Sequence, residues 1–220
     1  MKWDTIIFDL DGTLLNSLKD IANSANYTMG KLGFPEKEIE EIKGVIGKGA
    51  AYLLDSCLPL EQKENRTVFN RALQIFKEHY FLHGEENTIP YKGAEAFLKD
   101  FQKRGMKMAV VSNKPDEVAQ KIVRRFFGDS ISCIFGEKSG IAKKPAPDLV
   151  YAALKSLDSD RTGAVYIGDS EVDVLTAKNA GLPVILVTWG YRDKKILKTL
   201  GAEYMVDDFE ELSTLLIKEE

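Results

Sequence analysis

The first apolar stretch of the chain ends in a pair of carboxylates. Residues 6–8, Ile-Ile-Phe, form an apolar run typical of a strand buried in a parallel sheet. Asp9 and Asp11 follow, Gly12 allows a sharp turn of the backbone, and Thr13 adds a hydroxyl. Buried like charges are unfavourable unless a cation or a shared proton compensates them. The alternative is a turn that caps the strand, since Asp-Gly is a common turn pair.

Polar side chains also follow two later apolar runs. Ser112 and Asn113 come after one of them, and Asp169 and Asp173 come after the other. The carboxyl ends of parallel strands meet at one edge of a sheet, and ligands bind there. Ser112 or Asp169 alone could equally be a helix cap. The agreement among three strand ends favours a common site.

The carboxylates expected at this edge suit a metal ion with oxygen ligands. They are Asp9, Asp11, Asp169 and Asp173, and both histidines of the chain fall in a different segment. Mg²⁺ prefers a few carboxylates together with water, and it often bridges to a phosphate. The sequence therefore predicts a Mg²⁺ site and disfavours zinc.

A bound phosphate would also need a nearby cation. Lys143 and Lys144 precede Pro145, between a predicted strand and a predicted helix, and the proline limits where the lysines can point. A lysine pair before a helix is ordinarily a solvated surface feature. Because the three strand ends already predict a common site, Lys144 is a candidate phosphate ligand.

The composition is that of an ordinary globular protein. The chain has 220 residues, of which 44% are hydrophobic and 29% charged, and its net charge is −4. This balance gives no general attraction to nucleic acid or to an anionic membrane. No apolar run approaches the roughly 20 residues of a membrane helix. Two distant cysteines, Cys57 and Cys133, and an N-terminus unlike a signal peptide predict a cytoplasmic protein.

Apolar residues at helical spacing dominate the segment that follows the first strand. Helices are expected over residues 18–32, 36–45, around 52–54, and 60–80. No strand pattern occurs between them. Residues 16–87 are therefore predicted to form an all-helical domain, inserted into a core domain made of residues 1–15 and 88–220.

From residue 92 onward, apolar runs alternate with amphipathic segments. Strands are expected at 106–111, 131–135, 164–167, 184–187 and 204–206, with helices at 94–103, 116–127, 147–157, 170–180, 194–200 and 209–216. Such alternation is typical of right-handed βαβ units. The predicted fold class is α/β, with a doubly wound parallel sheet.

Together these motifs resemble the four signatures of the haloacid dehalogenase superfamily, in their usual order and over essentially the whole chain. They are Asp9-Leu10-Asp11-Gly12-Thr13, Ser112-Asn113, Lys144-Pro145 and Gly168-Asp169 with Asp173. The segment Ser112-Asn113-Lys114-Pro115 and the run Trp189-Gly190-Tyr191 further resemble the phosphoglycolate phosphatase group. The resemblance implies a Rossmann-like core with a helical cap.

The resemblance also implies roles for these residues. Asp9 would be the nucleophile that forms an aspartyl-phosphate, and Asp11 the general acid and base. Ser112 and Lys144 would hold the phosphoryl oxygens, with Gly12, Thr13 and Asn113 beside the substrate. The side chains of Asp9 and Asp169 and the carbonyl of Asp11 would hold Mg²⁺, and Asp173 would act directly on the metal or orient Lys144.

The loop Ile46-Gly47-Lys48-Gly49 falls where a cap loop of the family touches the leaving group. Its glycines are expected to let the cap open and close. Lys48 is a candidate ligand for a substrate carboxylate or a second phosphate, and the alternative is a solvated loop lysine.

The function expected from the resemblance is Mg²⁺-dependent hydrolysis of a small phosphate monoester, with 2-phosphoglycolate as the best candidate. Three alternatives stay open: a β-phosphoglucomutase-like phosphotransferase, a pyrophosphatase or nucleotidase of the same superfamily, and a module that only binds a phosphate ligand. The expected partner is a small molecule, the expected assembly a monomer or homodimer, and no nucleic acid or membrane partner is expected.

Overall fold

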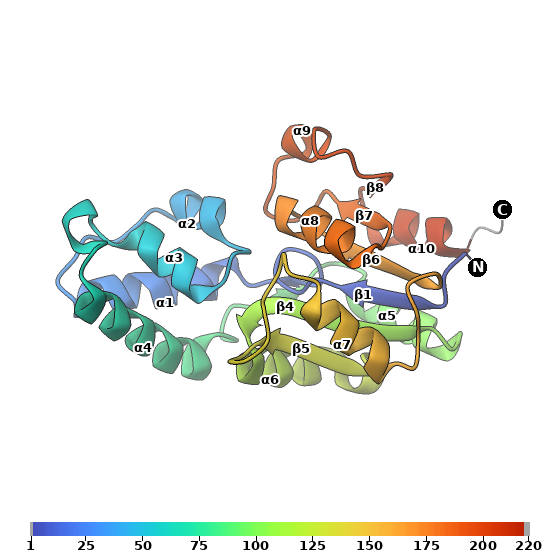
Figure 1. Cartoon of the computed structure of the whole chain (residues 1–220), viewed down its shortest axis with the longest axis horizontal. Helices are drawn as coiled ribbons and strands as arrows, with labels where there is room; N and C mark the ends of the chain where they lie inside the picture. Colours follow the sequence, from blue (N-terminus) through green and yellow to red (C-terminus); the bar gives the residue numbers. More distant parts are fainter. Residues whose placement is uncertain (1, 218–220) are drawn as a thin grey trace.

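A computed structural model describes residues 2–217 of the chain. Its centre is a six-stranded parallel sheet in the order β5-β4-β1-β6-β7-β8 (Figure 1). The strands are β1 (Thr5–Phe8), β4 (Lys107–Pro115), β5 (Cys133–Glu137), β6 (Ala164–Gly168), β7 (Val184–Val187) and β8 (Tyr204–Val206). The all-parallel pairing confirms the α/β prediction.

Helices cover both faces of this sheet. Alternate residues of β1 explain how: Ile6 and Phe8 face one hydrophobic core, whereas Ile7 faces a second. The first core includes residues of α5 (Ala94–Lys103), α6 (Asp116–Phe127) and α10 (Phe209–Ile217). The second includes residues of α7 (Asp148–Ser156) and α8 (Glu171–Ala180), and the short α9 (Lys194–Leu197) follows β7. Strands buried on both faces explain the continuous apolar runs in the sequence.

The segment between β1 and β4 is mostly helical and lies at one end of the molecule, on the left of Figure 1. It contains α1 (Leu18–Lys31), α2 (Ile39–Val45), α3 (Ala50–Cys57), a 3₁₀ turn (Leu60–Gln62) and α4 (Arg66–His83). We call α1–α4 the helical block. Its chain enters through β2 (Leu15–Asn16) and leaves through β3 (Ile89–Pro90), and these two strands pair antiparallel.

A buried carboxylate links the first helix of the helical block to the segment through which the chain leaves the block. Asp20, in the first turn of α1, is 1% exposed. It accepts hydrogen bonds from the main-chain N–H groups of Asn87 and Thr88 and from both of their side chains, at 2.7 to 3.0 Å. The start of the block is thereby tied to its exit.

Several expected boundaries differ from the structure. The helix expected over 60–80 begins only at Arg66, because Asn65 caps it by accepting a hydrogen bond from the Val68 N–H group. The helix expected over 36–45 begins at Ile39, and the strand expected at 131–135 spans Cys133–Glu137. The strand expected at 106–111 continues to Pro115, so Ser112 lies within β4 and does not cap α6.

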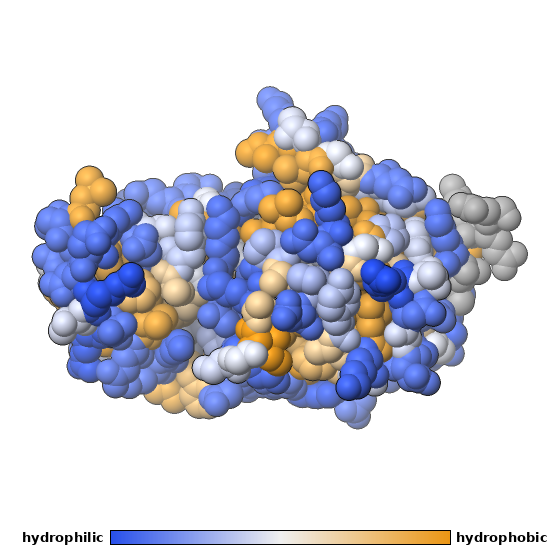
Figure 2. Space-filling model, in the orientation of Figure 1, coloured by the Kyte–Doolittle hydropathy of each residue, from blue (hydrophilic) through white to orange (hydrophobic). Residues whose placement is uncertain are grey.

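The molecular surface is largely hydrophilic on the face that Figure 2 shows, with hydrophobic residues scattered between charged ones. Among residues 2–217, no helix has the length and apolar character needed to cross a membrane.

Candidate active site

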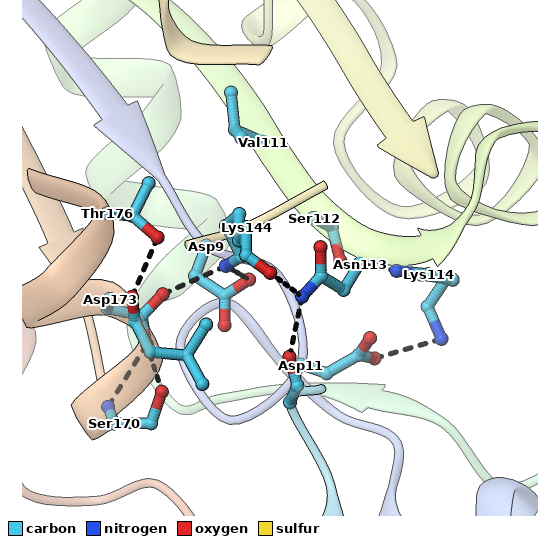
Figure 3. A network of polar contacts seen from close by, with 12 residues as sticks. Asp9, Asp11, Val111, Ser112, Asn113, Lys114, Lys144, Ser170, Asp173 and Thr176 are labelled. Atoms are coloured by element: carbon cyan, nitrogen blue, oxygen red, sulfur yellow. Dashed lines mark hydrogen bonds and ion pairs between the residues drawn. The ribbon is translucent and has the colours of Figure 1, made fainter. Parts of the chain in front are cut away.

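Three adjacent strands bring the predicted site residues together. β1 lies between β4 and β6, and the main-chain N–H of Asp9 donates to the carbonyl of Ile167 on β6. Asp9 therefore lies between Ser112, in the second half of β4, and Asp169, directly after β6. Figure 3 shows Asp9, Lys144 and Asp173 converging beside the carboxyl end of β1. The convergence expected from the strand ends is present in the structure.

Lys144 is the central cation of this cluster and is 4% exposed. Its Nζ donates to Asp9 Oδ1 at 2.6 Å, to Asp173 Oδ1 at 2.8 Å and to the Tyr166 hydroxyl at 3.1 Å. Burial alone would lower the Lys144 pKa, but the charges of Asp173 and Asp9 raise it well above its usual value. Lys144 therefore stays charged, with all three N–H donors used.

The carboxylates outnumber the cation. Burial raises the pKa of Asp9 to about 7, with Lys144 opposing the rise and Asp173 adding to it. Burial, followed by the charges of Asp173 and Asp9, also raises the Asp169 pKa well above its usual value. Burial is the main cause of both shifts, and the neighbouring carboxylates add to them, since three carboxylates share the single charge of Lys144. A cation bound there would remove this repulsion.

Asp9, Asp169 and Asp173 each offer an oxygen within 4.8 Å of the others, as a metal site requires. Asp173, however, is already saturated: Oδ1 contacts Lys144, and Oδ2 accepts from the N–H and hydroxyl of Ser170. Asp9 and Asp169 each keep one oxygen that makes no hydrogen bond within residues 2–217. Their donor set fits a hard cation such as Mg²⁺, with Asp173 holding Lys144 and the start of α8.

Two glycines shape the space around Asp169. Gly12 has φ +93°, and a Cβ there would lie 2.3 Å from Asp169 Oδ2. A Cβ at Gly190 would lie 2.4 Å from the same oxygen, whose hydrogen bond comes from the Tyr191 N–H at 2.7 Å. Only glycine permits this approach of the backbone to the carboxylate.

The hydroxyl groups predicted near a phosphate are buried and have capacity to donate. Ser112 Oγ accepts from the Lys114 N–H at 3.1 Å, so its own proton can point elsewhere. Thr13 Oγ1 has no hydrogen-bond partner among the described residues. The Asn113 amide instead donates to the carbonyls of Gly47, at 2.9 Å, and Lys144, at 3.0 Å, so it joins the loop of the helical block to the core.

Asp11 contacts different residues from those that Asp9 contacts. Its Oδ1 is 2.9 Å from Lys114 Nζ (Figure 3). The same oxygen accepts a hydrogen bond from the Ser17 hydroxyl. Lys114 also donates to the Tyr80 hydroxyl from α4. Lys114 and Tyr80 were not among the predicted site residues, although Lys114 directly follows the Ser112-Asn113 motif, which is a signal that could have identified it.

Lys48 lies elsewhere. Its Nζ is 3.8 Å from Glu171 Oε1 and 4.8 Å from the centre of the Tyr52 ring, and its side chain is 40% exposed. It is not one of the residues that line the cavity next to Asp9. Its predicted role in substrate binding stays a prediction without a contact to support it.

Arg192, like Asn113, connects the core to the segment between α2 and α3 of the helical block. Arg192 donates to the carbonyls of Lys43, at 3.1 Å, and Ile46, at 3.0 Å, while Glu171 accepts from its Nε at 2.8 Å. Sequence reasoning missed this residue because its role depends on contacts across the interface with the helical block.

A cavity lies between the sheet edge and the helical block. It offers about 50 Å³ to the centres of water-sized groups, which is room for only a few waters. Its lining joins charged or polar core residues to apolar residues of the block: Asp9, Asp11, Ser112, Asn113, Lys114, Ile21, Ile46, Leu53, Phe76 and Tyr80. The cavity is small and partly open to solvent, and the carboxylates of the core lie on its wall.

Comparisons with known proteins agree with this geometry. Residues 6–187 match the model of a family described as haloacid dehalogenase-like hydrolase. The phosphoglycolate phosphatase of Psychrobacter arcticus is 32% identical over 99% of this chain and 97% of its own length. That of Aquifex aeolicus is 34% identical over 84% of this chain and 85% of its own length. A crystal structure from Lactobacillus delbrueckii, provisionally named phosphoglycolate phosphatase, has a TM-score of 0.92 and 34% identity over the full length of both chains.

Proposed function

The chain belongs to the haloacid dehalogenase-like hydrolase family, and on that premise we propose that it is a Mg²⁺-dependent phosphatase for a small phosphate monoester, with 2-phosphoglycolate as the preferred substrate. The observation that carries the proposal is the buried cluster of Asp9, Asp169 and Asp173, two of which contact Lys144, next to a small cavity.

The chemistry proposed for the carboxylates is a double displacement. An oxygen of Asp9 attacks phosphorus, so that an Asp9–phosphorus bond forms while the bond from phosphorus to the leaving oxygen breaks. Asp11 gives a proton to the leaving alkoxide and later takes one from the water that attacks the aspartyl-phosphate. Inorganic phosphate and free Asp9 result, so one difficult displacement is divided into two easier ones.

The transferred phosphoryl group needs donors that are fixed before it arrives. Lys144 keeps its charge at 2.6 Å from Asp9 and would act on the phosphoryl oxygens as a fixed positive charge, whereas the hydroxyls of Ser112 and Thr13 have protons to donate. Positioning and charge stabilisation supply most of the rate enhancement in phosphoryl transfer. These three residues are the proposed phosphoryl ligands.

The proposed Mg²⁺ ligands are the side chains of Asp9 and Asp169 and the main-chain carbonyl of Asp11. A bound Mg²⁺ supplies charge that neutralises phosphoryl oxygens and keeps the anionic substrate close to anionic Asp9. Asp173 takes no ligand position in this proposal, since Lys144 and Ser170 already occupy both of its oxygens.

The helical block is proposed to act as a cap, with residues 16–87 as a separate domain. Arg192 and Asn113 of the core hold main-chain carbonyls of its loop, at Ile46 and Gly47. Because these contacts are hydrogen bonds to a few main-chain groups, they can break to admit substrate and re-form to exclude water.

The test is release of inorganic phosphate from a panel of esters, with and without Mg²⁺. The panel contains 2-phosphoglycolate, pyrophosphate, nucleoside monophosphates and β-glucose 1-phosphate, and the Asp9→Asn variant is the control. We expect Mg²⁺-dependent release, highest from 2-phosphoglycolate and abolished by Asp9→Asn. Preference for another ester would contradict the substrate. Conversion of β-glucose 1-phosphate to glucose 6-phosphate, without phosphate release, would contradict hydrolysis.

A further inference from the structure

Lys114 is a buried cation on the side of the cavity that faces the helical block. Its side chain is 1% exposed, yet it lines the cavity together with Asp9 and Asp11. It comes from the end of β4, and it crosses toward the helical block to reach Tyr80 on α4. It therefore lies between the carboxylates of the core and the apolar wall of the block.

The two buried lysines of the site differ in how fully they are paired. Lys144 contacts two carboxylates, Asp9 and Asp173, and a hydroxyl. Lys114 contacts one carboxylate, Asp11, and the neutral hydroxyl of Tyr80. An ammonium has three N–H donors. Beyond Asp11 and the Tyr80 hydroxyl, Lys114 Nζ has no further hydrogen-bond acceptor within residues 2–217, and its other contact is with the Tyr80 ring, whose centre lies 4.5 Å away. An incompletely paired buried donor is costly and favours an anionic ligand that reaches it.

Tyr80 gives the same place a second donor. Its hydroxyl oxygen accepts from Lys114, so its own proton is directed away from the ammonium. Tyr80 also lines the cavity, as do Ile21, Leu53 and Phe76, which offer no polar group to a substrate. Among the side chains that the helical block and the end of β4 contribute to the lining, Lys114 and Tyr80 therefore offer polar hydrogens to an anion.

We propose that Lys114, assisted by the Tyr80 hydroxyl, binds a carboxylate on the leaving group, and so restricts the enzyme to small phosphate esters of hydroxy acids. The proposal rests on the phosphatase function proposed above. One ammonium and one neutral hydroxyl match the two oxygens and single charge of a carboxylate, whereas a second phosphate would bring more charge than Lys114 can balance.

The enzyme is expected to discriminate against substrates whose leaving group lacks a carboxylate. A neutral leaving group would fill the space but leave the Lys114 donor unpaired, and sites built to bond a polar group reject analogues that lack it. One hydrogen bond to a charged group corresponds to a factor of roughly 10 to 100 in kcat/KM. The orientation of Lys48 toward Glu171 and Tyr52 gives it no comparable access.

The experiment compares 2-phosphoglycolate with its carboxamide, 2-phosphoglycolamide, which has the same shape without the charge. We expect the wild type to prefer the carboxylate by roughly 10- to 100-fold in kcat/KM, and Lys114→Met to reduce that ratio to about one. Tyr80→Phe, which keeps the charge, should reduce the ratio by less. Lys155→Met changes an exposed lysine of α7 and serves as the matched control, with the wild-type ratio retained.

Each arm can overturn the proposal. If the wild type shows equal kcat/KM for the carboxylate and the carboxamide, or if Lys114→Met leaves their ratio unchanged, Lys114 does not bind the carboxylate. Collapse of the ratio in Lys48→Met alone would assign recognition to Lys48. Absence of phosphate release from every ester by the wild type would instead refute the phosphatase function, and with it this proposal. If Lys114→Met does not fold, Lys114→Gln and Tyr80→Phe provide the same ratio test.

Discussion

Replacement of Asp169 by asparagine should stabilise the metal-free protein while it removes metal binding. Asp169 is 3% exposed and belongs to the group of three carboxylates within 4.8 Å of one another. Asparagine has the same shape, and its side-chain oxygen can still accept from the Tyr191 N–H. The substitution therefore changes the charge of the cluster and little else.

The size of the effect follows from the charges. When Asp169 is ionised, it faces Asp9 and Asp173, and Lys144 cancels only one of these two charges. A net unit charge no farther than 4.8 Å away, with an effective dielectric constant near 20, gives a repulsion of about 3 kcal/mol or more. Asp169→Asn removes this repulsion, so the free energy of unfolding should rise by about that amount at high pH.

The pH dependence provides the sharper test. Burial, Asp173 and Asp9 raise the Asp169 pKa in the folded state, so folding favours the protonated form. For such a group, the full stability is present below the pKa of the unfolded chain and is lost as the pH rises toward the folded pKa. The gain from Asp169→Asn should therefore be small near about pH 4 and largest near about pH 9.

Urea unfolding with EDTA, followed by circular dichroism, measures both quantities. Asp129→Asn, at a fully exposed side chain, is the matched control and should show no such trend. Added Mg²⁺ should stabilise the wild type at high pH and leave Asp169→Asn unchanged, because the variant lacks a ligand. A metal-free variant no more stable than the wild type at high pH would refute the charge argument.

Three further substitutions test other parts of the site. Lys144→Met leaves Asp9 and Asp173 without their shared cation, and should lower the free energy of unfolding by about 3 kcal/mol near neutral pH in urea denaturation; an unchanged midpoint would contradict the pairing. Gly12→Ala places a methyl group 2.3 Å from Asp169 Oδ2, and should weaken Mg²⁺ binding at least tenfold in calorimetric titration because the carboxylate must shift by an amount that costs about 1–2 kcal/mol of binding free energy; wild-type affinity would show that the carboxylate can move aside. Arg192→Gln removes charged donors from the block's loop carbonyls, and should raise KM roughly tenfold with a smaller change in the thermal midpoint; an unchanged KM would mean that Arg192 does not hold the closed arrangement.

The location of the site was predictable from the sequence because the relevant information is local. Apolar runs end at Asp9, Ser112 and Asp169, and the βαβ pattern requires these ends to lie at one edge of the sheet. The structure has them on adjacent strands, with Lys144 between Asp9 and Asp173. Residue types and strand ends were sufficient for this part.

Contacts across the interface between core and helical block were decided only by the tertiary structure. The sequence pointed to Lys48 as the cation near the leaving group, because its loop falls at the expected place. In the structure, Glu171 and Tyr52 contact Lys48, whereas Lys114 reaches Asp11 and lines the cavity. Spacing along the chain determines where a backbone lies, but the direction of a long flexible side chain depends on which charges and rings distant segments bring to it.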